Sequence, residues 1–145
     1  MEKIIIRIKS RTGNMPSYET EGSAGADIRA CLEEPITLMP GERRLIPTGM
    51  YVELPEGVEA QIRARSGLSI RHGITMINGV GTVDSDYRGE WNVPMVNLGQ
   101  EPYTINDGDR IAQAVFSRYE KASFILVDEV NSTERGGGGF GSTGI

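Results

Sequence analysis

Short runs of apolar and β-branched residues recur along the chain, and each is closed after a few positions by Gly, Pro, Asn or Asp. This alternation is typical of β-strands joined by tight turns. Turn-forming residues at 39–41, 54–57 and 106–108 separate neighbouring runs. No window repeats apolar residues at helical spacing over three turns, and the best helical candidate is the short segment 66–71. The pattern therefore predicts an all-β protein.

The predicted strands cover residues 3–9, 27–32, 43–46, 50–54, 58–63, 75–83, 90–98, 103–105, 110–118 and 124–127. Many short strands without a long helix favour a jelly roll or a closed, distorted β-barrel. A chain of 145 residues forms one core comfortably. We predict a single β domain over residues 1–134, followed by a flexible C-terminal flap over residues 135–145.

Charge and cysteine content narrow the function classes. The chain carries 15 basic and 20 acidic residues, a net charge of −5, which disfavours a general nucleic-acid binder. A stretch of ~18 apolar residues and a signal peptide are both missing from the sequence, so we expect no membrane partner. Cys31 is the sole cysteine, which fits a reducing compartment. We expect a cytoplasmic protein.

Six of the eleven residues from Arg135 to the end are glycine. Ordering such a stretch costs on the order of 10 kcal/mol in backbone entropy, so it is predicted to be mobile without a ligand. Glycine content alone favours a disordered tail. However, Arg135, Phe140 and Ser142 supply a guanidinium, an aromatic face and a hydroxyl, which suit a nucleotide with phosphates. Residues 136–141 match the GxGxxG pattern of dinucleotide-binding proteins, but no helix follows them, as that motif requires. The P-loop motif also fails, because Ser142 stands where it requires a lysine.

Two interior segments are unusually polar for a β domain. Residues 63–69 offer arginines, Ser66 and free N–H groups, which form either an anion cradle or a solvated strand end capped by Ser66. Residues 78–90 combine glycines with Asp84 and two nearby carboxylates. That segment is either a ligand-binding strand end, where glycine lets a planar ligand approach the backbone, or an exposed turn.

Five segments, taken together and in order, resemble the five motifs of the deoxyuridine triphosphatase (dUTPase) family. They cover residues 24–30, 65–69, 81–90, 108–113 and 135–144. Any one of these motifs is a weak signal, whereas five in sequence across nearly the whole chain are specific. Val83 stands where isoleucine is common and Ser69 where alanine is common, and neither change removes a polar role.

The resemblance implies a jelly-roll homotrimer with active sites at the subunit interfaces, each built from more than one chain. It also implies hydrolysis of dUTP to dUMP and pyrophosphate, with Mg²⁺ spanning the triphosphate. On this reading Asp84 activates the water that attacks the α-phosphorus, and Tyr87 packs under the deoxyribose and excludes a 2′-hydroxyl. Asp27 holds the metal through a bound water.

The remaining contacts that the resemblance implies fall into three groups. The uracil is read by Asn78, Gly81, Thr82, Val83 and Asn92. The phosphates are held by Arg65, Ser66, Gly67 and Gln113. The flap brings Arg135 and Ser142 to the γ-phosphate and Phe140 over the uracil, with Gly141 between them.

Two other functions share these features. A dCTP deaminase has the same fold, but it places a catalytic glutamate three residues before an asparagine on the strand after the third motif. Here that position, counted back from Asn97, is Pro94, which has no acid–base group and is expected at a strand edge or bulge. A non-catalytic trimer that binds nucleotide or a regulatory partner is the other alternative, and the presence of Asp84 argues against it.

Overall fold

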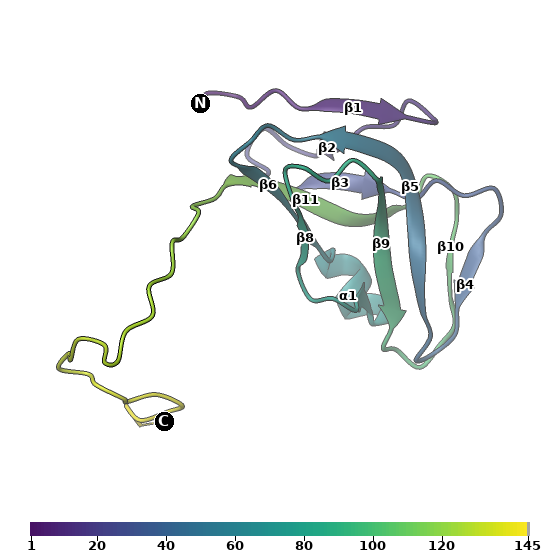
Figure 1. The fold of residues 1–145 in the computed structure, drawn as a ribbon. Coiled ribbons are helices and arrows are strands. Elements are labelled where there is room, and N and C mark those ends of the chain that lie inside the picture. The colour runs from purple at the N-terminus through teal and green to yellow at the C-terminus, as the bar shows by residue number, and fades with distance from the viewer. Residues whose placement is uncertain (145) are drawn as a thin grey trace.

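The computed structural model describes residues 1–144, whose regular structure consists of β-strands and one short helix (Figure 1). One sheet has the spatial order β1 (Arg7–Ser10), β5 (Arg43–Glu53), β9 (Glu90–Asn97), β7 (Ile74–Met76). The second has the order β2 (Ser17–Tyr18), β3 (Ala26–Arg29), β11 (Arg110–Arg118), β6 (Val58–Arg63), β8 (Gly81–Val83). A small pair joins β10 (Tyr103–Ile105) to β4 (Ile36–Leu38), and helix α1 covers Ser66–His72. All strand pairs are antiparallel.

The core is formed by the inward faces of the two larger sheets. Along β6 every second side chain is buried, and Ala60 and Ile62 belong to the same apolar cluster as Val93 and Met95 of β9. Fully burying one such aliphatic side chain contributes about 1.5–3 kcal/mol. The cluster joins strands of both sheets, so the all-β, jelly-roll prediction is confirmed.

Two predicted strands merge and one divides. The runs predicted at 43–46 and 50–54 form the single strand β5, whose register against β9 shifts between Pro47 and Tyr51. The run predicted at 75–83 becomes β7 and β8 because Gly79, with φ of 72°, turns the chain between them. β7 then pairs in the sheet of β9, and β8 pairs in the sheet of β6.

Three further expectations differ from the structure. The short strands β2 and β4 were not predicted, and the strand predicted at 124–127 is wrong, because that exposed segment pairs with no strand of the described residues. Pro94 is not at an edge or a bulge, since β9 lies between β5 and β7 and pairs Pro94 with Leu45. A proline keeps its carbonyl, and that of Pro94 accepts the N–H of Ile77 at 3.0 Å.

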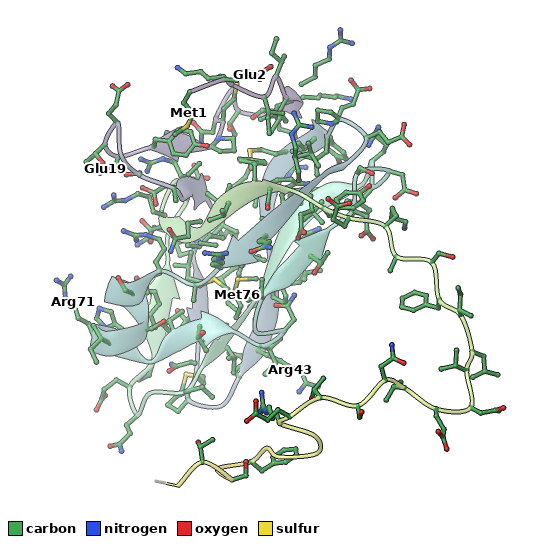
Figure 2. All side chains as sticks on the ribbon, turned by 90° about the vertical axis from the view of Figure 1, so that its left-hand side faces the viewer. Met1, Glu2, Glu19, Arg43, Arg71 and Met76 are labelled. Atoms are coloured by element: carbon green, nitrogen blue, oxygen red, sulfur yellow. The ribbon has the colours of Figure 1, made fainter. Side chains whose placement is uncertain are left out.

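Beyond β11 the chain leaves the β domain as an extended tail (Figure 1). Residues 119–144 contain no helix or strand. Tyr119 still contacts the domain through its hydrogen bond to Ser85, and Figure 2 shows the later part of the segment standing away from the body of the protein. Ile145, the last residue of the predicted flap, lies outside the described residues. Within residues 1–144 no helix has the length and apolar character that a membrane span requires.

Candidate active site

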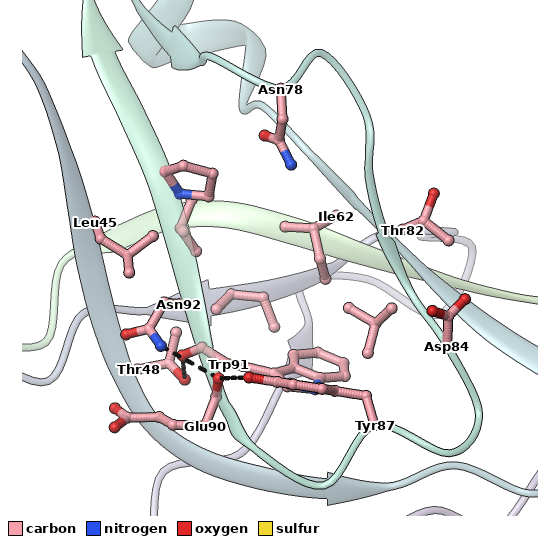
Figure 3. Close-up of a pocket in the computed structure, with 14 residues that line it drawn as sticks. Leu45, Thr48, Ile62, Asn78, Thr82, Asp84, Tyr87, Glu90, Trp91 and Asn92 are labelled. Carbon is pink, nitrogen blue, oxygen red and sulfur yellow. Dashed lines mark hydrogen bonds between the residues drawn. The ribbon is translucent and has the colours of Figure 1, made fainter.

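A pocket of about 340 Å³ opens between the two larger sheets, with β8 on one side and β5 and β9 on the other (Figure 3). Its apolar wall comprises Ile28, Leu45, Ile62, Val83, Trp91, Val93 and Pro94. Its polar lining comprises Thr48, Asn78, Thr82, Asp84, Tyr87, Glu90 and Asn92. A mostly apolar cleft with a few convergent polar groups is the usual form of a small-molecule site.

The turn between β7 and β8 positions the amide of Asn78 at one end of this pocket (Figure 3). A Cβ atom at Gly81 would lie 3.1 Å from the Asn78 side-chain nitrogen and 3.2 Å from the terminal methyl of Met76. Glycine at position 81 therefore lets the amide and the strand backbone approach each other closely.

Asp84 follows the last residue of β8 and is exposed at the rim of the pocket. Its carbonyl accepts the N–H of Tyr87 at 3.2 Å, which closes a turn, and Ser85 within that turn is hydrogen-bonded to Tyr119 at 2.9 Å. Asp84 also lines a neighbouring depression of about 820 Å³ together with Glu59 and Asp86. Asp84 thus borders open space on two sides.

Tyr87 and Asn92 converge on the backbone of Glu90. The Tyr87 hydroxyl donates to the Glu90 carbonyl at 2.8 Å, and the Asn92 amide donates to the same oxygen at 3.2 Å (Figure 3). The Glu90 side chain turns away from them and pairs with Arg11 at 3.0 Å. Hydrogen bonding from Arg11 lowers the pKa of Glu90, against the effect of burial, and the same bond raises the pKa of Arg11.

A second polar cluster lies where β3, β11 and the end of β6 adjoin. Asp27 contacts the Arg65 guanidinium at 3.6 Å and Arg110 at 3.4 Å, and only 14% of its side chain is exposed. The Gln113 amide donates to the carbonyl of Ala64 at 3.0 Å. A Cβ atom at Gly25 would overlap that amide, so the absence of a side chain there lets Gln113 reach its position.

Arg65 precedes the helix as its N-cap and makes no side-chain capping bond, so Ser66 is the first residue of α1 and the interpretation of Ser66 as the cap is wrong. Gly67 follows it in the first turn. The helix itself is confirmed, with one more residue at its C-terminal end than predicted, and it ends at Gly73 in the left-handed conformation with φ of 70°.

One chain does not bring the two clusters together. In the register of β6 with β8, Ala60 is opposite Val83, which puts Asp84 beside Glu59. Arg65 lies six positions farther along the same strand direction, roughly 20 Å away at ~3.3 Å per residue. Asp84, at one end of the pocket, and Arg65, in the cluster formed with Asp27, Arg110 and Gln113 (the Arg65 cluster), therefore lie far apart within one chain.

The candidate residues of the tail stay apart from both clusters. Arg135 donates to the carbonyl of Gly138 at 2.8 Å, and the N–H of Ser142 donates to Gly139 at 3.1 Å. Phe140 is fully exposed with φ of 52°, and Gly141 beside it also has a positive φ. These hydrogen bonds remain within the tail itself.

The described residues contain no group of three or more His, Cys, Asp or Glu side chains arranged to hold a metal ion. Asp27 offers a single, largely buried carboxylate beside two guanidinium groups. Because both of its oxygens face a guanidinium group, Asp27 fits Mg²⁺ only as an acceptor for metal-bound water, and the ion usually keeps several waters when it binds through phosphates.

Sequence reasoning gave no role to Thr48, Glu90 or Trp91, all of which line the pocket. The Thr48 hydroxyl donates to the carbonyl of Trp91 at 2.6 Å, across 43 positions of the chain. Glu90 is linked to Arg11 across 79 positions. Its acidic side chain at the start of a strand was the one local signal, and nothing in the spacing identifies a partner so distant.

Comparison with known proteins adds the family context for this geometry. The dUTPase family model matches residues 11–144. The chain is 56% identical to the deoxyuridine 5′-triphosphate nucleotidohydrolase of Finegoldia magna over 140 residues, covering 96% of this chain and 98% of that protein. It is 60% identical to the enzyme of the same name from Treponema denticola over 131 residues, covering 90% of this chain and 91% of the other.

Solved structures agree with the sequence relatives. The dUTPase of Staphylococcus bacteriophage 80alpha with dUpNHpp superposes with a TM-score of 0.88 at 26% sequence identity, covering 97% of this chain and 99% of that one. The G164S mutant of the same phage protein, also with dUpNHpp, gives a TM-score of 0.87 over the same shares of both chains.

Proposed function

Since the chain belongs to the dUTPase family, we propose that it hydrolyses dUTP to dUMP and pyrophosphate in a site shared between identical subunits. The observation that carries the proposal is the pocket between the sheets. Polar groups of residues 78–92 line it beside an apolar wall, and Asp84 lies at its rim. The relatives named for this activity cover nearly the whole chain.

The pocket is the proposed nucleoside site. Asn78 and the backbone of Gly81, Thr82 and Val83 would read the polar edge of uracil, since Gly81 lets the Asn78 amide lie close to the strand backbone. Asn92 would line the same pocket. Tyr87 would lie under the deoxyribose, where a fixed ring excludes a 2′-hydroxyl by steric overlap.

The Arg65 cluster is the proposed triphosphate site. The guanidinium of Arg65, the hydroxyl of Ser66, the N–H of Gly67 and the amide of Gln113 are all donors, as phosphate oxygens require. Donors fixed before the substrate arrives stabilise charge that builds on the phosphate oxygens during the reaction. Positioning and electrostatic stabilisation of this kind dominate catalysis of phosphoryl transfer.

The hydrolytic step is assigned to Asp84. Its exposed carboxylate would orient a water molecule and accept its proton as the water oxygen attacks the α-phosphorus in line with the leaving pyrophosphate. The bond formed is between the water oxygen and the α-phosphorus, and the bond broken joins that phosphorus to the oxygen bridging it to the β-phosphorus. The carboxylate would also meet the 3′-hydroxyl of the sugar.

Asp27 is the proposed protein group that holds Mg²⁺, through a bound water molecule, because it is the carboxylate within the cluster of phosphate donors. When bound, the ion neutralises part of the charge of the triphosphate. Arg65 and Arg110 keep the Asp27 carboxylate fixed beside that position.

The separation of the two clusters supports a homotrimer in which different subunits supply Asp84 and Arg65 to one site. The tail supports the same arrangement, because it leaves its own β domain (Figure 1). As a flap from another subunit it would place Phe140 over the uracil, with Arg135 and Ser142 at the γ-phosphate. Gly141, with φ of 88°, allows the turn between those side chains. Stacking of a base on an aromatic ring is worth ~1–3 kcal/mol.

Incubation of the protein with Mg²⁺ and each deoxynucleoside triphosphate in turn, with identification of the products, tests the proposal. We expect dUMP and pyrophosphate from dUTP, and much slower turnover of the other nucleotides. Release of ammonia from dCTP would identify a deaminase instead. Binding of dUTP without any product would identify a non-catalytic nucleotide-binding protein.

A further inference from the structure

The Glu90 carboxylate is held by three hydrogen bonds on the side of β9 away from the pocket. Arg11 donates to its two oxygens at 3.0 and 3.1 Å, and the N–H of Gly49 donates at 2.9 Å. Such a bidentate contact between a guanidinium and a carboxylate fixes both their distance and their orientation. Only 20% of the Glu90 side chain is exposed, against 47% of that of Arg11, so the carboxylate is the shielded partner of this ion pair.

The same three residues close the irregularity in β5. Gly49 has φ of 71° where the register with β9 shifts, and its carbonyl accepts the backbone N–H of Arg11 at 3.0 Å. Thr48 beside it donates to the carbonyl of Trp91 at 2.6 Å. The segment after β1 and the bulge of β5 thus hold the first two residues of β9 in place.

The backbone of Glu90 connects these contacts to the side chains of the pocket. Its carbonyl accepts the hydroxyl of Tyr87 and the amide of Asn92, as Figure 3 shows. A Cβ atom at Gly89 would overlap the Tyr87 hydroxyl, so the ring reaches this carbonyl only because residue 89 has no side chain. The orientation of the Tyr87 ring therefore depends on where the Glu90 backbone is held.

We propose that the ion pair of Arg11 with Glu90 is a positioning element that sets the discrimination between deoxyribose and ribose, acting through the Glu90 carbonyl on the ring of Tyr87. The inference rests on the proposed function, which puts the sugar on Tyr87. If the carboxylate is released, the start of β9 moves and the ring loses its fixed acceptor, so the space closed to a 2′-hydroxyl opens. Neither Arg11 nor Glu90 needs to touch the nucleotide for this effect.

The test compares kcat/KM for dUTP with kcat/KM for UTP in Glu90→Gln and Arg11→Met. Both values come from one preparation, so the folded fraction cancels and a loss of stability alone leaves the ratio unchanged. We expect the ratio to fall about fivefold to tenfold in both variants, on the scale of one ordinary hydrogen bond. Arg11→Lys keeps the charge but not the bidentate contact, so its ratio should lie between the ratios of Arg11→Met and the wild type.

Two controls make the result specific. Glu53→Gln removes the acid of the exposed pair with Arg7, 3.7 Å apart on the neighbouring strands β1 and β5, and should leave the ratio unchanged. Tyr87→Phe should lower the ratio, and adding Glu90→Gln to it should lower the ratio little further, because the two changes remove one shared constraint. Unchanged ratios in both Glu90→Gln and Arg11→Met, or full additivity with Tyr87→Phe, overturn the inference.

Calorimetric affinities for dUMP and UMP separate this inference from the proposed reaction. If the wild type binds dUMP in preference to UMP but hydrolyses no triphosphate, the proposed hydrolysis fails while the affinity ratio still tests Arg11 and Glu90. In that case a ratio lowered by both variants supports the inference, and an unchanged ratio overturns it. A wild type that shows no preference for dUMP overturns the inference as well.

Discussion

Asp84 and Arg65 lie toward opposite ends of β6, because the pairing of Ala60 with Val83 puts Asp84 beside Glu59 while Arg65 follows the far end of the strand. The first of these residues lines the pocket and the second belongs to the cluster proposed to bind the phosphates. A triphosphate held by Arg65 of one chain is therefore out of reach of Asp84 of the same chain. The proposed site therefore takes these two residues from different chains.

Replacing Asp84 by Asn should lower turnover of dUTP by roughly 10²–10⁴, the usual contribution of a general base, with little change in nucleotide affinity. The amide keeps the shape of the side chain but no longer accepts a proton from water. Steady-state turnover together with calorimetric binding of a non-hydrolysable dUTP analogue measures both effects. Undiminished turnover would remove Asp84 from the proposed step.

Gly25→Ala should disturb Gln113, because the added methyl group would occupy the space of its side-chain amide. We expect roughly a tenfold or greater loss of kcat/KM for dUTP, the usual result of displacing a positioned substrate contact. Gly22→Ala is the matched control, since nothing lies within 4 Å of a Cβ at position 22 and its backbone is unstrained. Equal kinetics for the two variants would contradict the role of Gln113.

A chain that ends before Arg135 should fold as the full-length protein does, because the tail beyond this point makes its hydrogen bonds within itself. Loss of the Phe140 stack alone should lower kcat/KM for dUTP by about 10–10². Thermal unfolding reports the fold, gel filtration reports the assembly, and the rate of dUMP formation reports catalysis. A truncated chain that unfolds would show that the tail is part of the β domain and not a flap.

The Glu90 carboxyl predicts a specific pH dependence of stability. Its pKa is lower in the folded protein than the ordinary value near 4.5, mainly because Arg11 donates to the charged form. The folded state thus gains stability above that ordinary value and loses it as the pH falls through the folded-state pKa. In urea unfolding, the free energy of unfolding should be larger for the wild type than for Glu90→Gln at neutral pH, and the difference should narrow as the pH falls below the ordinary pKa of the carboxyl. A difference that is constant with pH would show that the charge of Glu90 does not stabilise the fold.

The sequence predicted those strands well whose alternation and flanking turns are local. β6, β10 and β11 have the predicted bounds, since each has a clear apolar pattern between turn residues. β4 was missed because its three residues depend on distant β10, where Thr37 and Thr104 are 2.8 Å apart across 67 positions. Segment 124–127 has strand-forming residues but no partner strand among the described residues, and propensity alone does not make a strand.

In the candidate site too, the sequence predicts groupings of residues that are close in the chain but not contacts between distant residues. Five residues of the motif at 81–90 line one pocket, as their closeness in sequence suggests: Thr82, Val83, Asp84, Tyr87 and Glu90. Glu90 belongs to that motif, yet the contacts that hold it come from Arg11 and Gly49, far away in the chain. Such long-range contacts are set by the pairing of β1, β5 and β9, which no local pattern encodes.

Mixed assembly of two inactive variants tests the shared site most directly. Asp84→Asn and Arg65→Gln chains, each inactive alone, are unfolded, combined in equal amounts and refolded together, with each variant refolded separately as the control. If one site takes Asp84 and Arg65 from different chains, about a quarter of the sites in random mixtures have both groups intact, and dUTP hydrolysis should return to about that share of the wild-type rate. A mixture no more active than the separate variants would contradict a site assembled between subunits.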